Sequence, residues 1–297
     1  MTDHGRKPHR WANDLNAIMA AALGENRFPV PLELVAKDYS RQRFPQDPIV
    51  DIKGGSLGRF EGALYPVNGG WAIIYNSDVS TGRRRFTIAH EFGHYLMHRS
   101  LYPKGIECSE ASVTFRDGIE IEEEADAFAA SLLMPMLDCR KQLPASAVPT
   151  IGDLGALADR YEVSLISSTL RWLEYTERRA MLVISRDDFI LWSSSSAAAL
   201  KTGLYYRTRH APPIEVPLFA MARRKDLADI AQEGIKHPAG IWFGEECTEF
   251  TVHSDRYDQA ISLLLFGRAP ERSYWDFNRD DDTVDRIGQR SRRRFGD

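Results

Sequence analysis

Two histidines stand four residues apart, with a glutamate directly after the first, in the segment FTIAHEFGHYLMH at residues 86–98. In an α-helix, residues four apart lie on one face, about 6 Å apart along the axis, so His90 and His94 can direct two imidazole nitrogens at one ion. Glu91 is rotated by about 100° from His90, which places it beside the ion and not among its ligands. There it can take a proton from water that the ion activates, so the pattern indicates hydrolytic zinc chemistry.

The same three residues could also be ordinary polar side chains on a partly exposed helix. The apolar residues at the remaining positions favour a buried helix. Two buried histidines and a buried glutamate are costly without partners, which argues against the ordinary reading. Gly93, between the two histidines, leaves room for a close neighbour. The apolar positions are Phe86, Ile88, Ala89, Phe92, Leu96 and Met97.

His98 follows His94 by another four residues. It lies about 12 Å along the helix axis from His90, too far to join the same tetrahedral site. We expect it to support the site from outside or to have a structural role.

A catalytic zinc ion usually has three protein ligands and an open position, so a third ligand is expected from a second helix. The segment IEIEEEADAFAASLLMP, residues 119–135, is acidic at first and apolar from Ala127 onward, which predicts a helix that enters the core. Glu122 and Asp126 lie one turn apart on one face. This spacing lets Glu122 bind the metal while Asp126 accepts a hydrogen bond from the outer N–H of a ligand histidine. Glu124, rotated by about 200° from Glu122, is the alternative third ligand.

The elements that must hold these two helices are also legible in the sequence. Helical spacing is predicted over 11–24, and residues 49–76 have strand character, with Asn68-Gly69-Gly70 as a hairpin signal. The histidine helix is expected over 80–100, and further helices follow residue 136. From residue 180 to 267 strand character returns, and the chain ends in a charged tail.

Composition limits the classes of protein that fit. The chain of 297 residues has 43% hydrophobic residues, enough for a sizeable core, and its formal charge of −4 gives no general attraction to nucleic acids or membranes. Its three cysteines form no C-x-x-C pair, which suits a reducing compartment. No apolar leader or membrane span is recognisable, and we expect a cytoplasmic protein.

RRFTIAHEFGHYLMHR, followed after a loop by IEEEADAFAASLLMP, resembles the ImmA/IrrE family of intracellular zinc metallopeptidases. Members pair an R-F-T-x-A-H-E-x-G-H helix with an E-x-x-x-[ND]-x-F-A-x-x-L-L-M-P helix, and the match covers about residues 30–180. Asp126 stands where many relatives carry Asn, and either side chain can accept a histidine N–H. The segment GALYPVNGGWAIIYNS is similar to the sheet before the active-site helix.

The resemblance implies Zn²⁺ bound by His90, His94 and Glu122, with Glu91 as the general base. It also implies a narrow protein substrate: a helix-turn-helix repressor of the xenobiotic-response type, whose cleavage switches on a stress response or mobile-element genes. We expect that repressor to be a separate protein. The alternative is a zinc-binding regulatory protein that contacts a transcription regulator or a toxin without cutting it.

The expected fold is α+β: a zincin-like metallopeptidase core, with a small antiparallel sheet and the HExxH and ExxxD helices, a helical extension and a smaller C-terminal α+β domain. The expected boundaries are 1–145 for the metallopeptidase domain, 146–178 for the helix-turn-helix-like extension, 179–270 for the C-terminal domain, which related proteins suggest is sensory, and 271–297 for the tail.

Two segments could suggest direct DNA binding, a pair of helices and a basic run. The helices expected over 153–174 have a helix-turn-helix rhythm, but the second offers only Arg171 as a DNA-contacting cation, so we expect them to pack against the protease helices. The segment LFAMARRKDLADIAQEG is expected to be an amphipathic helix, and its basic run 223–225 a solvated helix end. Direct nucleic-acid binding is therefore not expected.

The sequence does not identify the group that stabilises the oxyanion. Tyr75, Arg85 and Tyr95 lie near the motif, but such tyrosines are more often packing residues and such an arginine is more often ion-paired. Cys108, between the two ligand helices, could approach the zinc as a thiolate, although a loop cysteine without such a role is the simpler reading.

Overall fold

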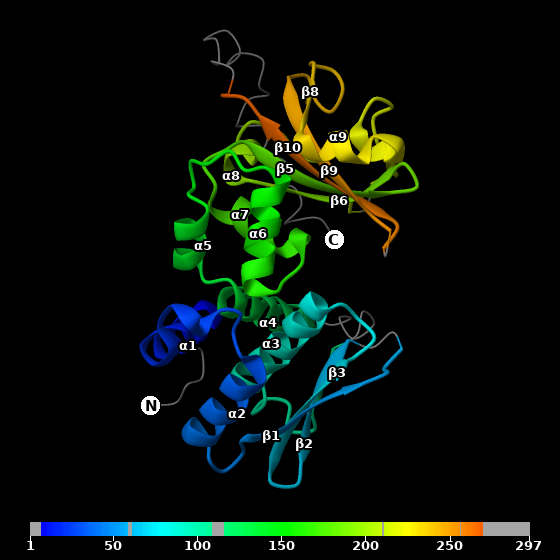
Figure 1. The fold of residues 1–297 in the computed structure, drawn as a ribbon. Coiled ribbons are helices and arrows are strands. Elements are labelled where there is room, and N and C mark those ends of the chain that lie inside the picture. The colour runs from blue at the N-terminus through cyan, green and yellow to red at the C-terminus, as the bar shows by residue number, and fades with distance from the viewer. Residues whose placement is uncertain (1–6, 59–60, 109–115, 210, 256, 270–297) are drawn as a thin grey trace, which may run out of the picture. The chain divides into compact units, whose positions relative to one another are not determined.

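The computed structural model describes residues 7–58, 61–108, 116–209, 211–255 and 257–269 (Figure 1). It has an α+β fold with two sheets, as the sequence predicted in outline. No helix within these ranges is long and apolar enough to cross a bilayer.

The first sheet has four strands in the order β1-β3-β2-β4. A two-residue turn of Asn68 and Gly69 joins β2 and β3, which confirms the predicted hairpin. The expectation of a purely antiparallel sheet was wrong, because β1 pairs in parallel with β3. The reason is the strand order: β3 lies between β1 and β2, so β1, which runs opposite to β2, runs with β3. The strands are β1 (Ile49–Gly55), β2 (Gly62–Val67), β3 (Gly70–Asn76) and β4 (Ile106–Cys108).

Helix α3 (Thr81–Met97) carries the histidine motif, and α4 (Arg116–Leu133) carries the acidic one. The backbone N–H of Arg83 donates to the Ser80 side chain, which caps the start of α3. The apolar side of α3 is buried in the main core, as its residue spacing predicted. Helices α1 (Pro8–Leu23) and α2 (Leu32–Arg43) add further apolar residues to that core, Trp11 and Leu15 among them.

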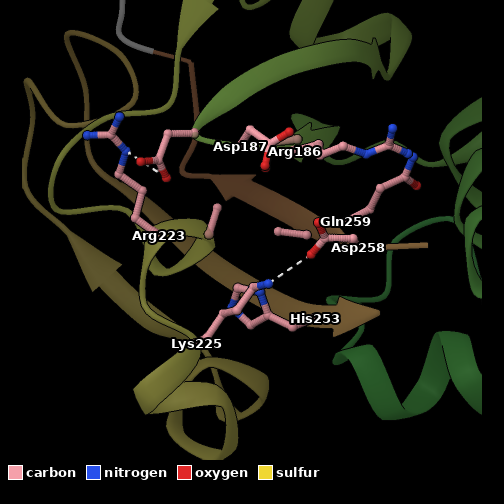
Figure 2. A pocket seen from close by; sticks show the side chains of 11 residues that line it. Arg186, Asp187, Arg223, Lys225, His253, Asp258 and Gln259 are labelled. Carbon is pink, nitrogen blue, oxygen red and sulfur yellow. Dashed lines mark hydrogen bonds and ion pairs between the residues drawn. The ribbon is translucent and has the colours of Figure 1, made fainter. Parts of the chain in front are cut away.

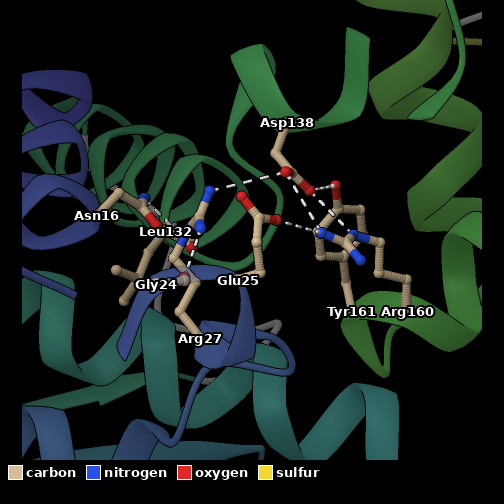
Figure 3. A network of polar contacts seen from close by, with 8 residues as sticks. All are labelled: Asn16, Gly24, Glu25, Arg27, Leu132, Asp138, Arg160 and Tyr161. Carbon is tan, nitrogen blue, oxygen red and sulfur yellow. Dashed lines mark hydrogen bonds and ion pairs between the residues drawn. The ribbon is translucent and has the colours of Figure 1, made fainter. Parts of the chain in front are cut away.

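A buried aspartate connects two consecutive helices with a turn that lies more than 100 residues earlier in the sequence (Figure 3). The Asp138 carboxylate, on α5 (Met136–Gln142), accepts hydrogen bonds from Arg160 Nε at 2.9 Å and Tyr161 Oη at 2.6 Å, both on α6 (Ile151–Tyr161). Arg27, in the turn after α1, lies 3.7 Å away. Because breaking such a buried ion pair is costly, Asp138 fixes the helices that follow α4.

The second sheet is antiparallel, with six strands in the order β7-β6-β5-β10-β9-β8. Its central strands, β5 (Ala180–Arg186) and β10 (Gln259–Phe266), are buried on both faces. Alternate residues enter different cores: Leu182 joins the main core that includes α3 and α4, whereas Met181 joins a smaller one. The other elements here are α7 (Leu165–Tyr175), β6 (Phe189–Ser195), α8 (Ala197–Leu200), β7 (Ile214–Glu215), β8 (Ile235–His237) and β9 (Cys247–Ser254).

The amphipathic helix expected over LFAMARRKDLADIAQEG is broken into short pieces. Two 3₁₀ turns, Met221–Arg223 and Lys225–Leu227, precede the six-residue helix α9 (Ala228–Glu233). The physical reason is a tertiary contact: the backbone N–H groups of Met221 and Ala222 donate to the Glu249 carboxylate on β9. The domain boundaries remain predictions, since one core cluster includes residues from α1 through β10.

Candidate metal centre

The Nε2 atoms of the two motif histidines point toward the same place. On α3, His90 Nε2 lies 2.9 Å from His94 Nε2, and their exposed fractions are 7% and 0%. The local reason is the spacing of four residues on a regular helix, which places the two rings on one face, where they meet edge to face. The helix thus presents two buried nitrogens to one point in space.

Glu122 on α4 completes this group. Its Oε2 lies 3.1 Å from His90 Nε2, and its Oε1 lies 3.4 Å from His94 Nε2. One ligand atom from each of the three residues lies within 4.8 Å of the others. A tetrahedral zinc ion with bonds of about 2.0–2.1 Å holds its ligand atoms about 3.3 Å apart, so the three residues fit a zinc ion in number, type and spacing.

A glycine lets the two helices approach closely at this point. A Cβ on Gly93 would lie 2.9 Å from Phe128 Cδ1 and 3.3 Å from Ala125 Cα, both on α4. Contacts this short leave no space for a side chain. The close neighbour that the sequence suggested beside Gly93 is therefore α4, and its proximity brings Glu122 within reach of the histidines.

The outer nitrogens of both histidines have partners. His90 Nδ1 lies 2.8 Å from Asp126 Oδ1, the contact expected from the E-x-x-x-D spacing. His94 Nδ1 lies 3.0 Å from His98 Nδ1, and His98 Nε2 lies 2.9 Å from Glu124 Oε2. Glu124, the alternative third ligand, is therefore placed on His98, one helical turn beyond the site, while Glu122 meets the histidines.

The surroundings of the two histidines shift their pKa values in opposite directions. Burial disfavours charge on His90, but hydrogen bonds to Asp126 and Glu122 outweigh burial and raise its pKa to about 10. For His94, burial prevails and lowers the pKa to about 4. Burial would raise the pKa of Glu122, but hydrogen bonds from both histidines lower it. A cation that binds here therefore competes with one proton, held on His90.

Glu91 is fully buried beside the centre, against strand β2. A Cβ on Gly62 would lie 2.8 Å from Glu91 Oε1 and 2.4 Å from Thr87 Cγ2. Only glycine fits between the strand and this helix. Gly62 was not predicted to have a role, and its only signal in the sequence is a glycine at the start of a strand.

The residues considered for an oxyanion role have other contacts. Arg85 donates to the Val30 carbonyl at 2.9 Å, and the buried Tyr95 donates to the Asp47 carbonyl at 2.9 Å. Tyr75 packs against Gly54, where a Cβ would lie 2.8 Å from its ring. The Cys108 side chain is outside the described residues.

Neither the helix pair over 153–174 nor the basic run 223–225 offers a free cationic surface. Arg171 is only 4% exposed and donates to the Ala130 carbonyl of α4 at 2.7 Å, which confirms the packing interpretation of this helix pair. Each cation of the basic run is ion-paired. Arg223 lies 3.3 Å from Asp188, Arg224 lies 2.8 Å from Asp226, and Lys225 lies 2.9 Å from Asp258.

Residues 46–172 match the model of the Peptidase_M78 family, described as an IrrE N-terminal-like domain. No curated protein matches the chain. A solved structure of a Mycobacterium tuberculosis transcriptional regulator is similar, with a TM-score of 0.50 and 14% sequence identity over 87% of this chain and 79% of that one. That likeness concerns the fold alone. Residues 46–172, which carry the converging side chains, thus match the IrrE N-terminal-like peptidase family, and this match confirms the resemblance to ImmA/IrrE.

Proposed function

We propose that the protein is a zinc-dependent endopeptidase with a zincin-like site, in which His90, His94 and Glu122 bind the metal. The observation that carries this proposal is the convergence of these three side chains, from two helices, within 4.8 Å. Asp126 holds the His90 ring through its Nδ1 atom.

Glu91 is the general base of the proposed reaction. When bound, zinc supplies Lewis acidity: it lowers the pKa of water toward about 7 and polarises the scissile carbonyl. The Glu91 carboxylate takes the proton of the attacking water and passes it to the amide nitrogen that leaves. Its complete burial against Gly62 keeps the carboxylate in one position for both transfers.

The proposed substrate is a separate helix-turn-helix repressor of the xenobiotic-response type, whose cleavage would switch on stress-response or mobile-element genes. This follows from the family resemblance, and the similar solved structure is that of a transcriptional regulator. The partner gene is often adjacent in such systems, so the neighbouring repressor is the first substrate to test.

The decisive experiment incubates the full chain and zinc with that repressor, and mass spectrometry of the products locates the cut. Glu91→Gln is expected to bind zinc normally while the cleavage rate falls by about 10²–10⁴-fold. Glu123→Gln, an equal change of charge on an exposed residue of α4, serves as the matched control and is expected to cleave normally. Undiminished cleavage by Glu91→Gln would refute the assignment of the base.

The second candidate is a regulator that retains the zinc site and acts by contact. The same experiment separates the two, because a repressor that is bound tightly but remains intact with zinc-loaded protein supports contact alone. Cleavage that requires both zinc and Glu91 supports the peptidase.

A further inference from the structure

A chain of three side chains leads from the candidate metal centre toward the surface of α4. His94 Nδ1 lies 3.0 Å from His98 Nδ1, and His98 Nε2 lies 2.9 Å from Glu124 Oε2. The two rings are buried, with exposed fractions of 0% and 2%, whereas the Glu124 side chain is 43% exposed. The chain therefore begins at a proposed ligand and ends at a carboxylate in contact with solvent.

The direction of these hydrogen bonds follows from their chemistry. A carboxylate only accepts, so the proton of His98 stands on Nε2 and its Nδ1 carries a lone pair. That lone pair requires a donor, so the proton of His94 stands on Nδ1. The Nε2 atom of His94, which faces His90 and Glu122, is then left with a lone pair, as a metal ligand requires.

We infer that Glu124 and His98 are positioning residues that fix the metal-binding tautomer and the ring orientation of His94. This inference rests on the proposed zinc function. Both proposed histidine ligands then end on a carboxylate of α4: His90 directly on Asp126, and His94 through His98 on Glu124. His98 acts as a spacer, because Glu124 contacts it one helical turn beyond His94.

Replacing the hydrogen-bond acceptor Glu124 by a donor tests the inference. In Glu124→Lys, the ammonium only donates, so His98 Nε2 must accept and its proton moves to Nδ1. That proton opposes the one on His94 Nδ1 and favours the His94 tautomer with Nε2 blocked. Glu124→Gln keeps an accepting oxygen. Glu123→Lys introduces the same charge change at the exposed neighbouring residue and is the matched control.

The affinity of the full chain for Zn²⁺ alone is measured by competition with a chelator. Glu124→Lys is expected to bind zinc about 100-fold more weakly than the wild type, with Glu124→Gln and Glu123→Lys within about threefold. Equal affinities of Glu124→Lys and Glu123→Lys would overturn the inference while leaving the zinc site intact. A wild-type protein without zinc affinity would overturn the proposed function as well.

A second measurement needs no variant and so does not depend on the folding of Glu124→Lys. Nitrogen-15 NMR of the imidazole rings in the zinc-loaded wild type is expected to find the proton of His94 on Nδ1 and that of His98 on Nε2. A His98 ring protonated on Nδ1 contradicts the proposed direction of the chain.

Discussion

Glu122 on α4 and Glu249 on β9 both lie among histidines and other polar groups, yet their surroundings differ in kind. Glu249 accepts from Trp242 Nε1 at 2.8 Å, Thr251 Oγ1 at 2.7 Å and two backbone N–H groups at 3.1 Å, and His237 Nε2 lies 2.8 Å away. Most of these donors never lose their protons. Burial would raise the pKa of Glu249, but the donors outweigh burial and lower it.

Glu122 instead meets two histidine nitrogens that are themselves 2.9 Å apart. Three such atoms share a small volume only when protons or a cation lie between them. A carboxylate saturated by permanent donors has a structural role, whereas one that faces converging histidine nitrogens indicates a cation site.

A third arrangement occurs at the turn ends of the second sheet, where a pocket of about 250 Å³ has charged walls (Figure 2). Its cations are paired: Lys225 Nζ lies 2.9 Å from Asp258, and Arg223 Nε lies 3.3 Å from Asp188. The Lys225–Asp258 pair is largely exposed to solvent, the Arg223 side chain is only 16% exposed, and the two pairs do not converge on one point. This pocket therefore lacks the feature that distinguishes the metal centre.

The largest effects are expected when each of the two carboxylates is exchanged for its amide. Glu122→Gln is expected to weaken zinc binding by more than about 100-fold, because an anionic ligand is lost, with little effect on stability. Glu249→Gln is expected to lower the free energy of unfolding by about 3–5 kcal/mol, because its new N–H groups face buried donors. Chelator competition and urea unfolding measure the two effects.

Each variant is the control for the other. Because the two sites share no side chain, zinc affinity in Glu249→Gln should stay within about threefold of the wild type. A loss of zinc binding in Glu249→Gln, or of stability alone in Glu122→Gln, would show that the division into structural and cation sites is mistaken.

Gly62→Ala tests whether the base beside the centre is held as tightly as the structure indicates. The new Cβ would meet Glu91 Oε1 at 2.8 Å and Thr87 Cγ2 at 2.4 Å. Displacing the carboxylate should reduce repressor cleavage by about 10–100-fold, with nearly unchanged zinc affinity. Gly155→Ala, where a Cβ would meet nothing within 4 Å, is the control. Equal cleavage by both variants would mean that Glu91 tolerates the shift.

The two carboxylate clusters should also differ in their response to pH. The pKa of His90 is raised to about 10 and that of His94 is lowered to about 4, so zinc displaces one proton near neutral pH. Zinc affinity should then fall about tenfold for each pH unit between about 8 and 6. Chelator competition at several pH values gives the slope, and a slope of zero or two would contradict this count.

The stability contributed by Glu249 depends on pH with the same sign, because it is also lost as the pH falls, but over another range. Its pKa is lowered in the folded protein, so its contribution is fully present above the unfolded carboxyl pKa of about 4.3 and is lost only as the pH falls through the folded value. Urea unfolding should therefore detect no change from Glu249 over the range in which zinc affinity falls.

The smallest effect is expected at the charged pocket. The side chains of Lys225 and Asp258 are 67% and 65% exposed, so water and salt screen their attraction. Lys225→Ala should shift the Tm by less than about 2 °C and leave zinc affinity unchanged. A markedly larger shift in a thermal melt would place this pair with the structural contacts of Glu249.

Some features of the site could be predicted because they depend on local geometry. His90 and His94 share a face since the helical repeat fixes residues four apart, and Glu122 and Asp126 follow the same rule. The pair Asn68-Gly69 predicted the hairpin, because a two-residue turn needs a backbone conformation that few residue types adopt. The apolar spacing likewise predicted which side of α3 is buried.

Other features were decided by tertiary structure. The packing of α3 on α4 selects Glu122 for the histidines and Glu124 for His98, and helical periodicity alone left both carboxylates open. The contact of Gly62 with Glu91, and the donation from Met221 and Ala222 to Glu249 that accompanies the broken helix, join residues distant in sequence. Which residues share a helix face thus follows from the sequence alone, because that spacing is local. Which faces meet depended on packing between elements, which no local repeat encodes.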